Sequence, residues 1–195
     1  MSDYTVIGDV GETLVTLLKE NMSDLITDSS IVLFSPGESP DSAEIRLMLF
    51  LYAIQENEHL KNHTVPNQNI LQPKLQPLSL DLYYMLTPYP SDAGDLTTRT
   101  KDAHYILGRA MRIFYDYSIL KGSILQGNLA GTNAEIRVVQ IAPSIEEISQ
   151  IWNTFKDTFY RLSVFYLVSP VNIDPTRESG GPRVTERVIN QNYLK

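Results

Sequence analysis

The chain contains no cysteine and only three histidines among its 195 residues. Without cysteine it can form no disulfide, thiolate metal site or thiol nucleophile, and it is compatible with any compartment. His59 and His63 are four residues apart, but the Thr-Val-Pro sequence that follows them argues against a metal-binding helix. His104 stands far from both in the sequence, so we predict no metal site.

Long apolar runs and excess positive charge are also lacking. No apolar run reaches the ~20 residues that a membrane-spanning helix needs. The N-terminus, Met-Ser-Asp-Tyr-Thr-Val, has no basic segment followed by an apolar one, as a signal peptide would have. The formal net charge is −7, whereas nucleic-acid phosphates require a basic surface. We therefore expect neither direct membrane insertion nor nucleic-acid binding.

The motifs of the common enzyme classes are absent. The sequence has no G-x-x-x-x-G-K-[ST] phosphate loop, no G-x-G-x-x-G dinucleotide fingerprint and no G-x-S-x-G nucleophile elbow. We therefore expect no catalytic residues, no cofactor and no enzymatic activity. The alternative is a hydrolase or small-ligand binder whose pocket places one of the histidines beside a carboxylate.

Residues 78–90 carry the clearest secondary-structure signal. Leucine or tyrosine occupies every second position from 78 to 86, which places these side chains on one face of a strand. Pro88 and Pro90 end the strand, because proline has no N–H for a central ladder. Further strands are predicted at residues 30–34, 43–58, 123–127, 134–141 and 160–168.

Four of these strands need comment. Residues 43–58 alternate, but their Glu, Ala, Leu and Met content leaves a helix as the alternative. Residues 123–127 and 134–141 are predicted to form a hairpin around the intervening Gly and Asn residues. Residues 160–168 are apolar on both faces, which indicates a central strand that ends before Pro170.

Apolar residues three to four positions apart predict helices at residues 6–22, 102–116 and 144–155. The third helix opens with Ser144-Ile-Glu-Glu147, a capping box in which each side chain bonds the other residue's backbone N–H. Its apolar residues, from Ile145 to Phe155, are expected on one side. Gly8 and Gly11 either allow close packing or delay the first helix, and Gly108 predicts a close approach of the second helix to the sheet.

Together these patterns predict an α+β fold. It is a single domain, residues 1–174, in which a mixed, mostly antiparallel sheet packs with about three α-helices. Residues 175–195 form an extended C-terminal arm. The arm contains a Ser-Gly-Gly-Pro run and then alternating residues at 183–190, and it carries about +2 while the remainder carries about −9. It could add a strand to another chain's sheet or fold back on its own.

Five segments, taken together and in order, resemble one family. They are residues 52–62, with Glu56-Asn57 and Leu60-Lys-Asn62; Leu80-Asp-Leu-Tyr-Tyr-Met-Leu-Thr-Pro-Tyr89; His104-Tyr-Ile-Leu-Gly-Arg-Ala-Met111; Ser144-Ile-Glu-Glu-Ile-Ser-Gln-Ile-Trp152; and Tyr160-Arg-Leu-Ser-Val-Phe-Tyr166. The chain resembles, over about residues 5–175, the N-terminal domain of the cap (tail-terminator) proteins of extracellular contractile injection systems, which are phage-tail-like particles.

The resemblance implies a non-enzymatic structural protein. Such caps form homohexameric rings that terminate the inner tube and hold the last ring of the contractile sheath, at the end distal to the baseplate. The implied partners are further copies of the chain, the tube protein and the sheath protein. The implied location is the bacterial cytoplasm during assembly and then the distal end of the particle, inside the cell or released from it. A baseplate or tube-initiator adaptor of the same machinery is the alternative.

The five segments that carry the resemblance have the patterns of buried core elements. The candidate partner-binding residues are therefore chosen from other parts of the chain. The arm could contact the sheath by strand addition, and the exit of the strand at residues 78–90 could contribute ring contacts. The candidates are Arg177, Arg183, Val184, Arg187, Val188, Ile189, Pro88 and Tyr89.

Overall fold

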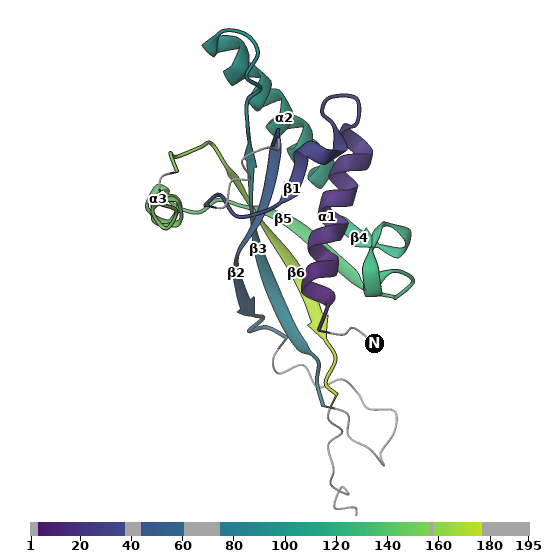
Figure 1. Ribbon diagram of the computed structural model, residues 1–195. Coiled ribbons are helices and arrows are strands. Elements are labelled where there is room, and N and C mark those ends of the chain that lie inside the picture. The colour runs from purple at the N-terminus through teal and green to yellow at the C-terminus, as the bar shows by residue number, and fades with distance from the viewer. Residues whose placement is uncertain (1–3, 38–43, 61–74, 157, 177–195) are drawn as a thin grey trace, which may run out of the picture.

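The computed structural model describes residues 4–37, 44–60, 75–156 and 158–176. The α-helices are α1 (Val6–Met22), α2 (Leu96–Asp116) and α3 (Ile145–Asn153). The strands are β1 (Ile31–Leu33), β2 (Leu47–Glu56), β3 (Leu78–Pro88), β4 (Ile119–Lys121), β5 (Glu135–Ile141) and β6 (Val164–Ile173). Three short 3-10 helices are η1 (Asp28–Ser30), η2 (Gly122–Ile124) and η3 (Gly127–Leu129). Figure 1 shows their arrangement.

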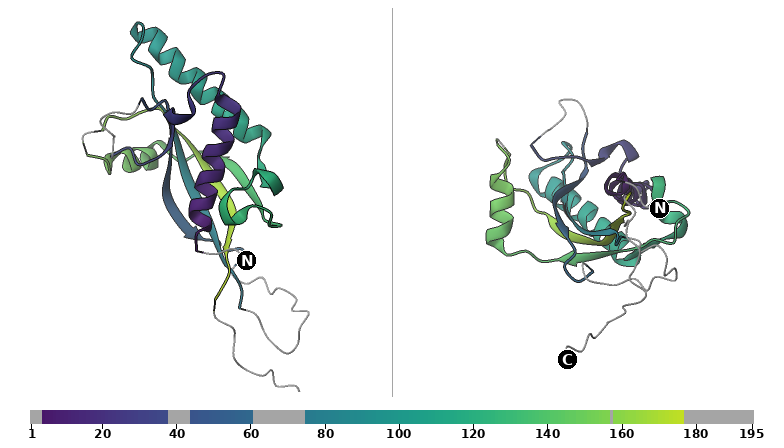
Figure 2. Two further views of the ribbon diagram at one scale, coloured as in Figure 1. Left: turned by 45° about the vertical axis from the view of Figure 1, so that its right-hand side comes forward. Right: turned by 90° about the horizontal axis from the view of Figure 1, so that it is seen from below.

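The strands form one sheet in the order β1-β2-β3-β6-β5-β4. β1 and β2 are parallel, and every other pair is antiparallel. The sheet is strongly curled when it is seen along its strands (Figure 2). The predicted α+β fold, with a mixed and mostly antiparallel sheet and three α-helices, is confirmed. The predicted strand at residues 43–58 is observed as β2, Leu47–Glu56, and not as the alternative helix.

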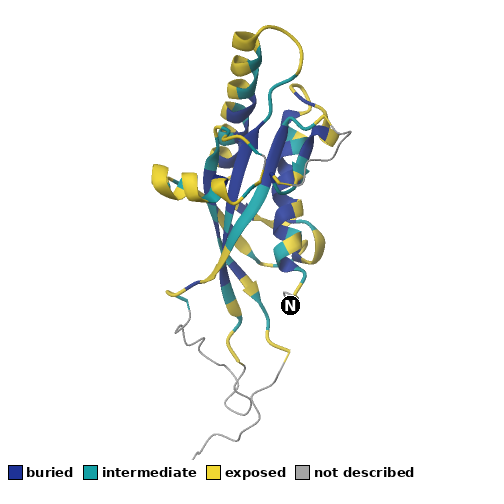
Figure 3. Cartoon of the chain, turned by 60° about the vertical axis from the view of Figure 1, so that its left-hand side comes forward, coloured by how far each residue is buried: buried dark blue, intermediate teal, exposed yellow. Residues whose placement is uncertain are grey.

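Two layers of helix cover the sheet. α1 and α2 lie on what we call the first face, where Leu82, Tyr84 and Leu86 of β3 are buried in the main core. α3 lies on the opposite, second face, where Trp152 packs with Met85 and Phe165. The period-two prediction for residues 78–90 is therefore confirmed, and β3 ends at Pro88 as expected. Burial is concentrated where helices and sheet overlap (Figure 3).

The first helix begins at Val6, so its glycines do not delay it. Gly11 is buried, and a Cβ built there would lie 2.7 Å from Cδ2 of Leu33 in β1. Gly8 is exposed, and a Cβ built on it would have no neighbouring atom within 4 Å. Close packing therefore explains Gly11 and not Gly8.

The prediction for Gly108 was wrong. This glycine is exposed, and a Cβ built on it would meet nothing within 4 Å, so it marks no approach to the sheet. α2 is also longer than residues 102–116, because Asp95 caps it earlier: its side chain accepts a hydrogen bond of 2.8 Å from the Thr98 N–H. His104 is exposed on this helix.

The hairpin was predicted in the wrong place. Residues 123–127 form no strand. The strand that pairs with Glu135, Ile136 and Arg137 is β4, which begins four residues before residue 123. The apolar spacing there serves 3-10 turns whose Leu125 and Leu129 are buried in the main core. A strand and a pair of tight turns both bury alternate apolar residues, so periodicity did not distinguish them.

β6 was predicted too early and too short. Residues 160–163 precede the strand, and Tyr160 is 64% exposed. The strand then continues through Pro170 to Ile173. It tolerates the proline because its register against β3 shifts between Leu80 and Leu82, and a bulge is where a sheet can accommodate a missing N–H. Its predicted central position, between β3 and β5, is confirmed.

α3 begins as predicted, and Ile148, Ile151, Trp152 and Phe155 pack together against the second face as expected. Ser144 Oγ accepts from the Glu147 N–H at 3.2 Å, and a Glu147 carboxylate oxygen accepts from the Ser144 N–H at 2.7 Å. The capping box is therefore confirmed. Ile145 stands seven residues, close to two turns, before buried Trp152 and therefore lies on the same side of the helix. It is nevertheless 88% exposed, so the sheet does not cover the first turn of α3.

We predict that Gly108→Ala raises the free energy of unfolding by about 1 kcal/mol, since alanine favours helix and its methyl group enters open space. Urea denaturation measures the effect. Gly127→Ala should instead destabilise the chain, because Gly127 has φ +58° and a Cβ there would lie 2.2 Å from Oδ1 of Asp9. Destabilisation by Gly108→Ala would contradict the packing of α2.

We predict that Ser144→Ala lowers the stability of α3 by about 1 kcal/mol. Removing the serine hydroxyl leaves the Glu147 N–H at the start of the helix without its hydrogen-bond acceptor. Fluorescence of Trp152, the only tryptophan of the chain, reports the docking of α3 during urea unfolding. Ser149→Ala, at an exposed position within the same helix, is the matched control and should change little. Equal effects of the two variants would argue against the capping box.

The capping box should also respond to acid. Hydrogen bonds from the Ser144 backbone and side chain lower the pKa of Glu147 below its ordinary value. The contribution of a group with a lowered pKa is present above the ordinary carboxyl pKa and is lost as the pH falls through the lowered one. The stability difference between the native chain and Glu147→Gln should therefore be largest near neutral pH and vanish in acid. A difference that persists in acid would contradict this.

Candidate partner-binding surfaces

Six of the candidate partner-binding residues belong to the C-terminal arm. Arg177, Arg183, Val184, Arg187, Val188 and Ile189 lie outside the described residues, as does His63. Their proposed role in partner binding stays a prediction.

The exit of β3 is better defined. Pro88 is buried, and Tyr89 is half-buried. The Tyr89 N–H donates to the Arg46 carbonyl at 2.9 Å, and its hydroxyl lies 3.7 Å from the Met48 sulfur. The Arg161 guanidinium carbon lies 4.5 Å from the ring centroid, a cation–π geometry. Tyr89 is therefore held by contacts with Arg46, Met48 and Arg161, and both Tyr89 and Arg161 are only partly exposed.

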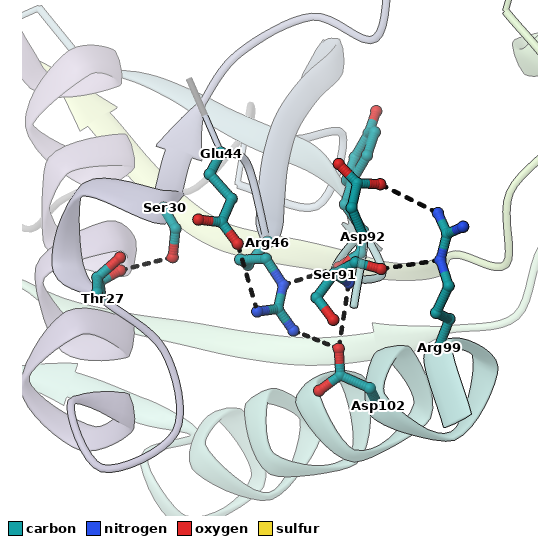
Figure 4. A network of polar contacts seen from close by, with 9 residues as sticks. Thr27, Ser30, Glu44, Arg46, Ser91, Asp92, Arg99 and Asp102 are labelled. Carbon is teal, nitrogen blue, oxygen red and sulfur yellow. Dashed lines mark hydrogen bonds and ion pairs between the residues drawn. The ribbon is translucent and has the colours of Figure 1, made fainter. Parts of the chain in front are cut away.

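A polar network fixes the segment between β3 and α2 (Figure 4). Arg46, whose side chain is only 14% exposed, forms an ion pair with Asp102 of α2 and donates to the Tyr89 carbonyl at 3.3 Å. The same Asp102 carboxylate accepts from the Ser91 N–H at 3.3 Å. Arg99 donates to the Ser91 carbonyl at 2.9 Å. The network joins the start of β2 to α2, so its role is to position these elements.

A groove of about 480 Å³ lies between α3 and the second face of the sheet. Its residues are Tyr52, Ala53, Gln55, Tyr83, Ile141, Ala142, Pro143, Glu147, Gln150 and Ile151. Its one carboxylate, that of Glu147, is engaged in the capping box and has a lowered pKa. The pKa of Tyr52 is raised, mainly by burial and to a smaller extent by the charges of Tyr83 and Glu147. A carboxylate held ionised and a phenol held neutral make a poor acid–base pair at neutral pH.

The histidines do not support the alternative of a hydrolase or ligand binder. His59 and His104 are exposed, and neither lines the groove. Among the residues that the structure describes, no three histidine or acidic side chains cluster as metal ligands. Within the same residues, no helix is long and apolar enough to cross a bilayer.

Sequence reasoning missed two apolar surfaces. The connection from α3 to β6 exposes Phe159 (88%), Tyr160 (64%) and Leu162 (47%). The two edges of the sheet also expose apolar side chains, Leu33 and Ile54 at one edge and Ile119 and Val139 at the other. Tyr160 and Leu162 were predicted to lie in the central strand at residues 160–168, and Phe159 stands just before that range. Exposed apolar clusters of this kind are typical of protein–protein contact surfaces.

Solved structures similar to this chain are terminator proteins. One is the sheath/tube terminator of an extracellular contractile injection system, PVC, in the extended state, with a TM-score of 0.63 and 16% identity over 100% of this chain and 65% of that one. Another is the tube-terminating cap of the anti-feeding prophage, with a TM-score of 0.61 and 16% identity over 94% of this chain and 61% of that one. The chain thus spans less than two thirds of either. A search of curated proteins found no match.

The family assignment rests on the sequence. The Pvc16 N-terminal domain family matches residues 9–186, nearly the whole chain, and the resemblance to cap proteins found in the sequence is thereby confirmed. This chain belongs to the Pvc16 N-terminal domain family.

Proposed function

We propose that this protein is a structural cap of a contractile injection system. It forms a homohexameric ring that terminates the inner tube and holds the last sheath ring at the end distal to the baseplate. The observation that carries the proposal is the family match over residues 9–186. Two solved structures with the same fold, both described as terminators, support it. The protein is assembled in the bacterial cytoplasm and stays with the particle.

The described surfaces suit such a role. A cap works by contact, and this chain exposes apolar side chains at both sheet edges and at Phe159 and Tyr160. Its groove holds no histidine and one engaged carboxylate, which supports a function without catalysis. A closed ring is the natural solution for head-to-tail contacts between identical subunits. It leaves no subunit edge without a neighbour.

The arm and the β3 exit complete the proposed contacts. Residues 183–190 add a strand to the sheath protein, with Val184 and Val188 on one side and Arg183 and Arg187 on the other. Tyr89, at the β3 exit, contributes to contacts within the ring.

We predict that deleting residues 183–195 weakens sheath attachment and leaves the domain folded. Particles assembled with the shortened chain should lose sheath from the distal end, as counted by electron microscopy. The thermal melting curve and Trp152 fluorescence of the purified protein should stay unchanged. A matched control replaces Arg183 and Arg187 by lysine, which keeps the charge and the strand pattern. Loss of solubility or folding on deletion would show instead that the arm belongs to the domain.

The ring itself has a direct test. Purified particles should carry this chain at the end distal to the baseplate with six copies per particle, by cryo-electron microscopy or quantitative mass spectrometry. Density at the baseplate end would favour the adaptor role. A chain that never co-purifies with particles would overturn the proposal.

A further inference from the structure

One line of exposed side chains runs along the outer side of α2. The helix buries its inner side, which includes Ile106, Ala110 and Ile113, against the sheet and α1. The exposed line consists of Lys101, Tyr105, Gly108, Arg112 and Tyr115, which we name the α2 stripe. Its members are spaced four, three, four and three residues apart. This spacing keeps them on one side of the helix, and it is the spacing of the seam between two packed helices.

The side chains of the α2 stripe have no partner within the described part of the chain. Tyr105 is 67% exposed and Tyr115 is 82% exposed. Among the residues that the structure describes, neither these tyrosines nor Lys101 and Arg112 make a hydrogen bond, an ion pair or a ring contact. Two large aromatic side chains and two cations are therefore available to another molecule.

Gly108 stands at the centre of the α2 stripe. It is exposed, and a Cβ built on it would meet no atom within 4 Å, so the fold itself does not require a glycine there. Glycine is among the least favourable residues within a helix. Where two helices cross, however, the absence of a side chain lets their backbones come close together. Gly108 therefore marks the point at which a second helix can cross α2.

The α2 stripe is complementary to itself when it is read in the opposite direction. When two α2 helices lie antiparallel and cross at Gly108, residues before the crossing in one copy meet residues beyond it in the other. Tyr105 comes three residues before Gly108, and Arg112 comes four residues beyond it. Tyr105 and Arg112 are seven residues apart and so share one flank of the helix. Each Arg112 guanidinium therefore meets the Tyr105 ring of the other copy, as in a cation–π pair.

The ends of the α2 stripe match in the same way. Lys101 comes seven residues before the crossing, and Tyr115 and Asp116 come seven and eight residues beyond it. The Lys101 ammonium of one copy thus meets a ring and a carboxylate of the other. Asp116 is exposed and, although it follows Arg112 by one turn, the structure shows no ion pair between them. The two Lys101 side chains lie about 21 Å apart along the helices, so like charges stay separate.

The other charged groups beside the stripe do not oppose this arrangement. Asp102 pairs with Arg46, and Arg109 pairs with Asp24, on the flank that faces the rest of the domain. His104 is exposed on the other flank. A two-fold rotation brings equal flanks together, so His104 does not meet the flank that carries the stripe's arginine.

We propose that the free chain forms a two-fold dimer in which two α2 stripes cross antiparallel at Gly108. The N-terminal half of α2 extends beyond the sheet (Figure 1), which leaves room for a second helix. Such a contact is isologous, because one surface meets itself. Neighbours in a homohexameric ring instead join two different surfaces, so the dimer belongs to the chain before it enters a particle. It does not depend on the proposed cap.

Sedimentation of the purified full chain over a range of concentrations tests the dimer. The native chain should be dimeric and should dissociate on dilution. Gly108→Leu should raise the dissociation constant at least several-fold, because the new side chain occupies the crossing point. In the monomer that side chain enters open space, so urea unfolding of the diluted variant should start no earlier than that of the native chain. Ser149→Leu, at an exposed position of α3, is the matched control and should sediment like the native chain.

Exchange of two charges tests the ends of the contact. Lys101→Glu and Asp116→Lys should each weaken the dimer several-fold, because each places like charges opposite one another. The double variant should restore most of the lost affinity. Positions 101 and 116 lie about 22 Å apart on one helix, so the restoration can arise only between two chains.

Cysteine variants test the direction of the helices, since the chain has no cysteine of its own. Under mild oxidation Gly108→Cys should give a disulfide-linked dimer, because the two copies of position 108 face each other. Lys101→Cys should remain uncrosslinked, because an antiparallel contact holds its two copies about 21 Å apart, far beyond the reach of a disulfide.

Each contrary result overturns the proposed dimer. A chain that is monomeric at every concentration does so, and so does a dimer that Gly108→Leu leaves unchanged. Disulfide-linked dimers of Lys101→Cys would show a parallel contact. If Gly108→Leu sediments like the native chain but no longer enters particles, the α2 stripe binds a particle protein and not a second copy. None of these results alters the position or the copy number of the chain in particles, which test the cap separately.

Discussion

The fold depends on β3 being enclosed on every side. Its neighbours β2 and β6 pair along both edges, and helices cover both faces. Tyr84 and Met85, adjacent in sequence, are therefore both almost completely buried, one in each layer. Burial raises the pKa of Tyr84 well above its usual value, so its phenol stays neutral. The remaining strands extend the sheet outward from β3 and its two partners, and α1, α2 and α3 pack on its faces.

Buried polar groups in this protein serve structure. Asn57 donates to Asp81 at 2.8 Å and accepts from the Leu60 N–H at 3.0 Å, which fixes the turn at the end of β2. Ser169 also donates to Asp81, beside the bulge that accommodates Pro170. Asn57, Asp81 and Ser169 thus meet their hydrogen-bonding requirement within the fold. What remains available for partners is the apolar and charged surface at the sheet edges and near α3.

The sequence predicted the elements that bury one regular face. Residues 78–90 alternate without interruption, so their strand was predicted closely, and the capping box at Ser144 located the start of α3. Prediction failed where a local feature replaced the simple period. Gly122 and Gly127 adopt positive φ and support tight turns at residues 122–129, and Pro170 enters a strand through a bulge. The exposed apolar residues at the sheet edges could not be predicted, because their positions depend on strand order, which joins residues far apart in the chain.

The N-terminal half of α2 has mechanical consequences. The buried residues of this helix begin at Ile106, and its first ten residues, about 15 Å of helix, contribute none of them. This half of the helix extends beyond the end of the sheet, and the helix is packed against the core only on its C-terminal side (Figure 3). The ion pair between Arg46 and Asp102 holds this half of α2 against the start of β2. Arg46, at the start of β2, therefore helps to fix the position of the exposed first turn of α2 at Leu96, fifty residues later in the chain.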